Sequence, residues 1–295
     1  MRFLICSLIF IGLLFVFAQW NVTAYSALGS GFCNCSNCTD CTNALNDSTS
    51  CYVEVDLTSN ISNNVGNCIY NPANFNNKTF DCRGHTIDGD DSGTDNGIYL
   101  EGKTNNTIRN CTITDFSYGL QLYSSSSSTV VNNTVTSNSH TGIYLFYTRS
   151  TLVSKNTANL NTYYGILLRN SYSNNTLTDN TANLNGDTGI FVYSSSNNNN
   201  IIGNTVLNNT EDGLYLGTNS YNNIVNSNRF CSNNLAVGSY YDVENLDSNS
   251  GRNNTCDSYY NWNDEGTGGC AYMCSGGNRY TLQLSFGWNL ISLPF

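Results

Sequence analysis

The stretch NTANLNTYYGILL at residues 156–168 returns 24 positions later as NTANLNGDTGIFV at residues 180–192. Each copy joins an Asn-rich segment to a Gly that is followed by aliphatic residues. This Gly recurs, in steps of 22 to 24 residues, at Gly97, Gly119, Gly142, Gly165, Gly189 and Gly213. A period of this size is the signature of a repeat architecture, in which each repeat stacks on the one before it.

Two more columns keep the same period. An aliphatic column comprises Ile108, Val130, Val153, Leu177, Ile201 and Val225. An Asn column comprises Asn133, Asn156, Asn180, Asn204 and Asn228, with Cys111 in the corresponding slot one repeat earlier. Apolar residues within a repeat alternate at two-residue spacing, as in Ile143-Tyr144-Leu145, which is the period of a strand and not of a helix.

These columns predict an all-β fold, a right-handed parallel β-helix of about seven coils, with short strands joined by polar bends. The Asn column is expected at a bend, where the side-chain amides hydrogen-bond from coil to coil as a ladder. Two inward residues per coil should form the core: Ile98, Leu120, Ile143, Ile166, Ile190 and Leu214, with Leu100, Leu122, Leu145, Leu168, Val192 and Leu216 two positions on.

The rest of the chain divides around this helix. Met1-Arg2 and the apolar run over residues 3–18 predict a signal peptide at 1–24, and no other segment has enough apolar residues to span a membrane. We expect a Cys-rich N-terminal cap at 25–79, the β-helix at 80–247 and a Cys-rich C-terminal cap at 248–278. An apolar strand tail at 279–295 is expected to dock on its own helix or to add as a strand to another molecule, with truncation as the alternative.

Thirteen Cys less Cys6 in the signal peptide leave twelve, an even number that suggests up to six disulfides in a secreted protein. The spacing of Cys33, Cys35, Cys38 and Cys41 would also suit zinc or an iron–sulfur cluster, but disulfides are favoured after a signal peptide. Connectivity does not follow from sequence. Proximity alone pairs Cys231 with Cys256, and Cys270 with Cys274.

The net charge of −10 and the presence of only three Lys argue against nucleic acid as a partner. About a dozen Asn-x-Ser/Thr sequons, such as Asn77-Lys78-Thr79, indicate a secreted surface that is able to carry glycans.

The segment FDCRGHTIDG at 80–89, the GIYL that follows it and the repeated NNT units resemble the secreted right-handed parallel β-helix proteins. This group includes the carbohydrate-binding and sugar-hydrolase repeats and the periplasmic copper-maturation repeats. The resemblance covers roughly residues 80–270 and implies the fold. It leaves the function open, because this fold hosts enzymes, adhesins and non-catalytic surface proteins. Copper does not carry over, since copper sites draw on His, Met and Cys, and the mature chain has only His85, His140 and Met273 beside its paired Cys.

Two columns are candidate sites. Two residues before each Gly stand Asp95, Ser117, His140, Tyr163, Asp187 and Glu211. Asp187 and Glu211 should lie on adjacent coils about 5 Å apart, which is the separation of a retaining glycosidase pair. The same column would suit calcium, and solvated bends are also rich in such residues for turn reasons alone. No other metal or cofactor is expected.

The second column lies between the inward residues of each Gly-anchored strand and points outward: Tyr99, Gln121, Tyr144, Leu167, Phe191 and Tyr215. Its aromatic members, Tyr99, Tyr144, Phe191 and Tyr215, are suited to stack on sugar rings, although aromatic residues also favour strands in general. The sequence therefore predicts a secreted or cell-surface protein that binds a polysaccharide or surface glycan, or acts in adhesion, without catalysis. A polysaccharide hydrolase or lyase that uses Asp187 and Glu211 is the alternative, and a structural envelope component is the third.

Overall fold

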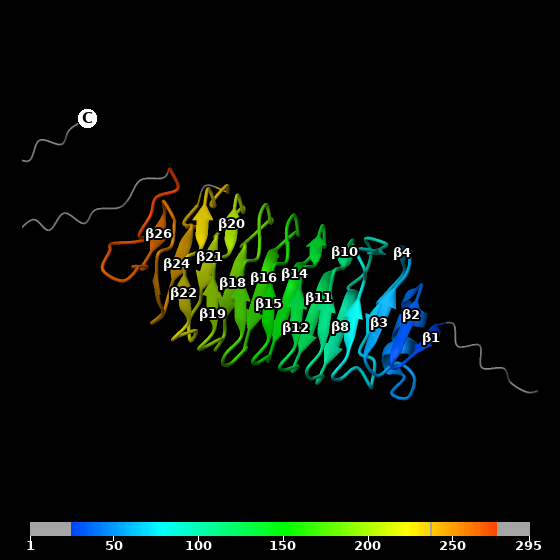
Figure 1. The fold of residues 1–295 in the computed structure, drawn as a ribbon. Coiled ribbons are helices and arrows are strands. Elements are labelled where there is room, and N and C mark those ends of the chain that lie inside the picture. The colour runs from blue at the N-terminus through cyan, green and yellow to red at the C-terminus, as the bar shows by residue number, and fades with distance from the viewer. Residues whose placement is uncertain (1–24, 237, 276–295) are drawn as a thin grey trace, which may run out of the picture.

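The computed structural model describes residues 25–236 and 238–275, which wind into a right-handed parallel β-helix (Figure 1). Each coil contributes short strands to sheets that run along the helix, and the coils follow one another in chain order from the blue to the orange end of Figure 1. The predicted fold class is confirmed. The predicted signal peptide and the whole of the predicted apolar tail lie outside the described residues.

Sheet A has eleven strands, and only the pairing of its first two is antiparallel. They are β1 (Ser26–Gly29), β2 (Phe32–Cys35), β3 (Glu54–Leu57), β6 (Thr79–Asp81), β9 (Thr107–Arg109), β12 (Thr129–Val131), β15 (Leu152–Ser154), β17 (Thr176–Thr178), β19 (Asn200–Ile202), β22 (Ile224–Asn226) and β25 (Ser250–Arg252).

Sheet B is interrupted, and single bridges from Thr134 through Thr157 and Thr181 to Thr205 connect its two parts. Its strands are β4 (Ile61–Asn64), β7 (Thr86–Gly89), β10 (Thr112–Thr114), β13 (Thr134–Thr136), β20 (Thr205–Leu207) and β23 (Arg229–Cys231).

Sheet C has the longest strands of the three sheets and one strand in each of nine coils. These are β5 (Ile69–Tyr70), β8 (Asn96–Glu101), β11 (Tyr118–Tyr123), β14 (Thr141–Phe146), β16 (Tyr164–Arg169), β18 (Ile190–Tyr193), β21 (Leu214–Leu216), β24 (Val243–Asn245) and β26 (Tyr259–Tyr260). The count of nine corrects the predicted seven. The repeat pattern fades in both predicted caps, but strands there still pair in parallel with the central coils.

The core is the predicted one. All twelve aliphatic residues predicted to point inward from sheet C are fully buried, and so is the aliphatic column of sheet A. The Gly that precedes each sheet C pair is required by close approach of the coils. A Cβ on Gly165 would lie 2.7 Å from both the Asn185 amide nitrogen and the Gly189 carbonyl oxygen. Any larger residue at this position would push adjacent coils apart.

The predicted Asn ladder is also confirmed. Each member donates its side-chain amide to the Oδ1 of the next, as in Asn156 to Asn180 and Asn180 to Asn204, both at 3.0 Å. Two parallel ladders accompany it, Asn138–Asn161–Asn185–Asn209–Asn233 and Asn175–Asn199–Asn223. The predicted ladder continues from Asn228 to Asn254 and ends on the carboxylate of Asp264. The ladder from Asn138 to Asn233 ends on the carboxylate of Asp242.

The recurring Asn-Asn-Thr triplet has a structural explanation in these bends. In the triplet 132–134, Asn132 is exposed with a φ of 58°, Asn133 is a buried ladder residue, and Thr134 begins β13. Asn is among the few residues that adopt left-handed backbone readily, because its short side chain bonds locally. Many of the sequons are therefore required by the fold, whether or not they carry glycans.

Helix α1 (Cys38–Asn46) and three disulfides form the N-terminal end of the rod. The twelve Cys of the described residues all pair, as Cys33–Cys51, Cys35–Cys41, Cys38–Cys68, Cys82–Cys111, Cys231–Cys274 and Cys256–Cys270. Disulfides, and not a metal cluster, thus account for the Cys-rich segment at 33–41.

The two pairings suggested by proximity, Cys231 with Cys256 and Cys270 with Cys274, are wrong. Each of these cysteines bonds to a partner 14 or 43 residues away. The physical reason is the stacking. Tyr272 bridges to Thr255, and Thr255 to Arg229, so each turn of the cap lies on residues far back in the sequence.

Candidate functional site

The outer surface of sheet C carries the candidate binding residues. The parallel register places Tyr99, Gln121, Tyr144, Leu167, Phe191 and Tyr215 in one column, as predicted. Strand alternation puts a second column on the same side two residues later, which comprises Glu101, Tyr123, Phe146, Arg169 and Tyr193. We call the aromatic residues of these two columns, the rings that stack on them and Arg169 the aromatic face.

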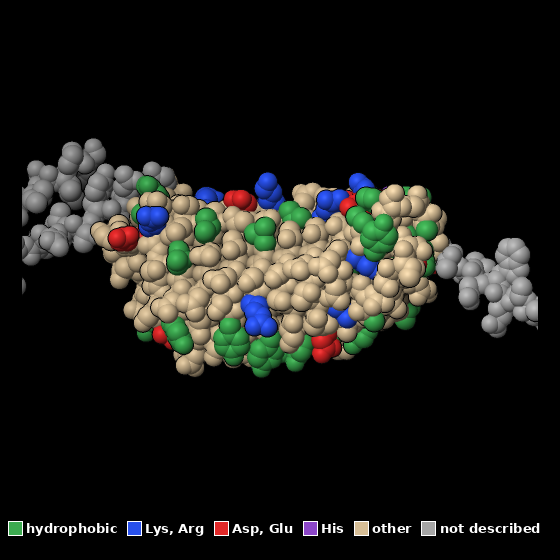
Figure 2. All heavy atoms as spheres, turned by 60° about the horizontal axis from the view of Figure 1, so that its bottom comes forward, with side chains coloured by type: hydrophobic (Ala, Val, Ile, Leu, Met, Phe, Trp, Pro, Cys, Tyr) green, Lys and Arg blue, Asp and Glu red, His purple; other side chains and the backbone are tan. Residues whose placement is uncertain are grey.

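Ring contacts make the aromatic face continuous over the middle coils. Tyr164 stacks on Phe191 with ring centroids 4.8 Å apart, and Phe191 stacks on Tyr193 at 4.7 Å. Phe191 also contacts Tyr215 one coil further on. On earlier coils, Tyr118, Tyr144, Phe146 and Tyr147 form a similar series. In the face drawn in Figure 2, most side chains are uncharged and hydrophobic ones gather along the lower margin.

Not every residue of the predicted stripe is open to solvent. Tyr144 is only 7% exposed and Leu167 only 4%, although both point away from the core. Tyr144 stacks against Tyr118 at 5.8 Å and against Phe146 at 5.6 Å, so its neighbours on the same surface cover it. Phe191 and Tyr215 are half-buried and keep ring surface that a ligand is able to reach.

Arg169 lies within this aromatic surface. Its guanidinium carbon is 5.3 Å from the ring centre of Phe146 and 5.4 Å from that of Tyr193. A hydrogen bond to the Tyr144 hydroxyl raises the pKa of Arg169. Its Nε is buried and has no hydrogen-bond partner. The ion pairs found among the described residues all involve Arg83 or Arg109, and none involves Arg169.

The acidic column borders the same face. Consecutive coils hydrogen-bond there through the backbone, Asp187 N–H to Tyr163 carbonyl and Glu211 N–H to Asp187 carbonyl, both at 3.0 Å. The carboxyl groups of Asp187 and Glu211 lie close enough to interact. Burial and then the Asp187 charge raise the pKa of Glu211, and the Tyr240 hydroxyl also bonds to Glu211. The structure thus brings the two predicted acids together.

Asp187 and Glu211 lie on adjacent coils, as predicted. A retaining glycosidase keeps its two carboxyl groups about 5–5.5 Å apart so that a sugar carbon fits between them. Two neighbouring carboxyl groups disfavour the ionisation of both, in line with the raised pKa of Glu211. Asp212, beside them, is 3% exposed, and burial raises its pKa to about 7. Burial thus raises the pKa of two acids at this margin, Glu211 and Asp212.

His140 occupies the acidic column two coils before Asp187. Its ring lies between Tyr118 and Tyr163, at centroid distances of 4.7 and 4.8 Å, and its Nδ1 is 2.8 Å from the Thr141 hydroxyl. Burial lowers the pKa of His140. The imidazole is therefore neutral at pH 7 and extends the aromatic surface past the edge of sheet C.

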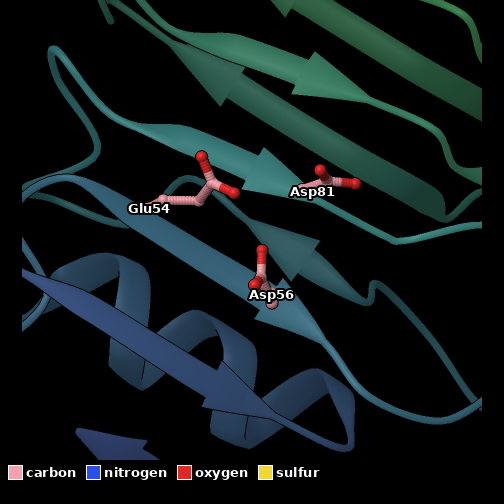
Figure 3. Close-up of side chains that lie close together, drawn as sticks. All are labelled: Glu54, Asp56 and Asp81. Atoms are coloured by element: carbon pink, nitrogen blue, oxygen red, sulfur yellow. The ribbon is translucent and has the colours of Figure 1, made fainter. Parts of the chain in front are cut away.

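A separate charged cluster near the N-terminal end was not predicted. Glu54 and Asp56 of β3 and Asp81 of β6 lie close together (Figure 3). Arg83 reaches Glu54 and Asp56 at 2.9 and 2.8 Å, and Arg109 reaches Asp81 at 2.8 Å. The two guanidinium groups offset two of the three carboxylate charges, so the cluster is an ion-pair network in this structure. Its sequence signal was the alternating acids in EVD at 54–56, with Asp81 in the same register one coil on.

Sequence comparison identifies the family. The chain matches the family described as periplasmic copper-binding protein (NosD) over residues 33–212, and again over residues 137–284. The chain belongs to the NosD family. Membership and the six disulfides indicate an extracytoplasmic protein. Among the residues that the structure describes, no helix is both long and apolar enough to cross a bilayer. Among curated proteins, none matches the sequence.

The described residues do not form a copper site of His, Cys or Met. His85 precedes β7 of sheet B and His140 precedes β14 of sheet C, so the two imidazoles belong to different sheets. The twelve described cysteines are in disulfides, which removes thiolate ligands. In this NosD protein the donor set of the described chain thus differs from what copper prefers.

Three solved structures of similar fold carry the names of enzymes that act on polysaccharides. The Azotobacter vinelandii mannuronan C-5 epimerase AlgE4 A-module is 17% identical, with a TM-score of 0.50, over 77% of this chain and 74% of that one. Pectate lyase Pel9A is 17% identical, with a TM-score of 0.53, over 77% of this chain and 62% of its own. The periplasmic alginate epimerase AlgG is 19% identical, with a TM-score of 0.51, over 61% of this chain and 46% of its own. Identities this low establish the shared fold alone.

Proposed function

We propose that this NosD-family protein binds a polysaccharide on its aromatic face, without catalysis, as a secreted or cell-surface protein. The observation that carries the proposal is the series of ring contacts that runs from Tyr118 through His140 and Tyr164 to Phe191 and Tyr215 on one side of the solenoid. Flat aromatic rings present apolar area to the axial C–H faces of sugars and hydroxyl groups to their edges.

The geometry also fits a polymer. Successive coils repeat the same surface at the strand spacing of about 4.8 Å, so a long ligand meets similar contacts along its length. Solenoids use extended surfaces of this kind for binding. The names of the structurally similar proteins, two epimerases and a lyase of polysaccharides, point to the same class of ligand.

Binding by calorimetry or a glycan array tests the proposal. The triple variant Phe191→Ser, Tyr193→Ser, Tyr215→Ser should weaken glycan binding more than tenfold, because it removes the reachable rings of adjacent coils. Tyr144 is left unchanged, since it is covered. The matched control is Leu152→Ser, Ile224→Ser, which removes exposed apolar residues from sheet A. Equal loss in both variants, or none in the first, would reject the aromatic face.

A second candidate is a polysaccharide-active enzyme that uses Asp187 and Glu211, favoured by the raised pKa of Glu211 beside Asp187 at the margin of the same face. Perturbed carboxyl groups beside a binding surface are common at active sites. Release of reducing ends or unsaturated products from a bound polysaccharide tests it. Activity that disappears in Asp187→Asn, Glu211→Gln while binding persists would establish catalysis at this pair.

A further inference from the structure

We infer that Arg169 makes the aromatic face selective for polysaccharides that carry sugar carboxylates. This inference rests on the proposed function and names the chemistry of its ligand. It begins from a mismatch of charge. The chain has 21 acidic and 11 basic residues, yet Arg169 forms no ion pair with any described carboxylate.

The aromatic rings around Arg169 attract the flat face of its guanidinium group, but one hydroxyl is the only hydrogen-bond acceptor found for its N–H groups among the described residues. Phe146 and Tyr193 lie beside it on the neighbouring coils, at 5.3 and 5.4 Å from the guanidinium carbon. The Tyr144 hydroxyl provides one hydrogen bond, and Nε remains buried without a partner. A guanidinium has five N–H donors, so most of its hydrogen-bonding capacity is left for another molecule.

Ring stacking alone would explain a flat cation in an aromatic surface. It does not explain why the guanidinium forms no ion pair with a described carboxylate in a chain that is rich in carboxylates. The fork of the two terminal nitrogens matches the two oxygens of a carboxylate, which it binds through two parallel hydrogen bonds. A sugar carboxylate stacked on Phe146 or Tyr193 would bring its oxygens to this fork.

Asp187 and Glu211 lie at the other end of the sheet C strands, and the acids on the face itself, Glu101 and Glu244, lie three coils from Arg169. Asp187 precedes Tyr193, the coil neighbour of Arg169, by six residues, which span at most about 20 Å, and neither Asp187 nor Glu211 forms an ion pair with Arg169. The cation and the acids therefore do not neutralise one another. They give the two margins opposite character, so a bound sugar acid would be oriented with its carboxylate toward Arg169.

Matched ligands isolate the carboxylate. Hexasaccharides of β-1,4-glucan, β-1,4-mannan and β-1,4-galactan are each compared with the same chain oxidised at C6 to the uronate, and with the same chain sulfated at O6. We expect at least one uronate to bind tenfold or more tighter than its neutral parent, and tighter than its sulfate. Arg169→Gln should remove this preference. Arg169→Lys should keep only part of it, because Lys is a point charge and not a fork.

Arg149→Gln is the matched control, since Arg149 lies exposed on the bend after β14 and its loss changes the net charge equally. It should leave the preference intact. Thermal unfolding of each variant confirms that it is folded. Neutral chains that bind as well as the uronates, or a preference that survives Arg169→Gln, would overturn the inference and leave the proposed function standing. Preference for the sulfates would overturn the choice of carboxylate. Failure of all the ligands to bind would overturn both proposals.

Discussion

The side-chain amide of Asn156 donates a 3.0 Å hydrogen bond to the Oδ1 of Asn180, and this bond joins the first residues of the two NTANLN copies. The last residues of the copies, Asn161 and Asn185, are joined in the same way at 3.1 Å. The sequence is therefore repeated because adjacent coils need the same hydrogen-bonding residues. A ladder works only if the same residue stands at the same place in each coil.

Removing one member should be costly. Asn180 accepts two hydrogen bonds from Asn156 and donates to the Val153 carbonyl and to Asn204. Asn180→Ala leaves buried donors and acceptors without partners, and we expect a loss of about 2–4 kcal/mol in the free energy of unfolding. Asn200→Thr, on the outer side of β19, is the control and should change it by less than about 0.5 kcal/mol. Denaturant unfolding of both variants measures the difference, and comparable values would show that the ladder does not stabilise the fold.

Close approach of the coils gives a second stability prediction. Gly165→Ala places a Cβ against the Gly189 carbonyl and the Asn185 amide. Because both neighbours belong to hydrogen-bonded coils that have little room to move, we expect a loss of at least about 2 kcal/mol. Gly268→Ala, where an added Cβ meets nothing within 4 Å, should be neutral or slightly stabilising. If the two substitutions have equal effects on the melting temperature, the coils are more tolerant than the packing indicates.

The pKa of Asp212 predicts how stability depends on pH. Burial raises this pKa to about 7 from an ordinary 3.8, so the folded state holds a proton that the unfolded chain releases. The resulting penalty is absent below about pH 4, grows between pH 4 and 7, and is complete above pH 7. Asp212 accepts a hydrogen bond from the Tyr241 N–H, and Asp212→Asn keeps a side-chain oxygen that accepts the same bond. It should therefore stabilise the protein at pH 8 by about 2–4 kcal/mol and hardly at all at pH 4. Unfolding curves at the two pH values provide the comparison, and equal shifts at both would contradict the assignment.

Periodicity explains what was predictable. The alternation in Gly165-Ile166-Leu167-Leu168 assigns Ile166 and Leu168 to the core, and the 24-residue step brings Asp187 beside Glu211. Both follow because a solenoid converts sequence period directly into spatial neighbourhood. Features outside the period were not accessible. Tyr240 reaches Glu211 from an irregular segment, and Cys274 reaches Cys231 from a cap whose spacing no longer follows the repeat.

The burial of Tyr144 is a different kind of omission, and it yields the last prediction. Alternation correctly points Tyr144 outward, but it predicts nothing about the adjacent column, whose Phe146 and Arg169 contact it. Tyr144→Ser should therefore cost about 2–4 kcal/mol of stability, close to that of a core aromatic residue. Tyr215→Ser, at a half-buried position of the same column, should cost less than half as much. Equilibrium unfolding of the two variants distinguishes a packed outer layer from an open stripe. If Tyr144→Ser is as mild as Tyr215→Ser, Tyr144 is free to meet ligand, and the binding surface then extends across the middle of sheet C.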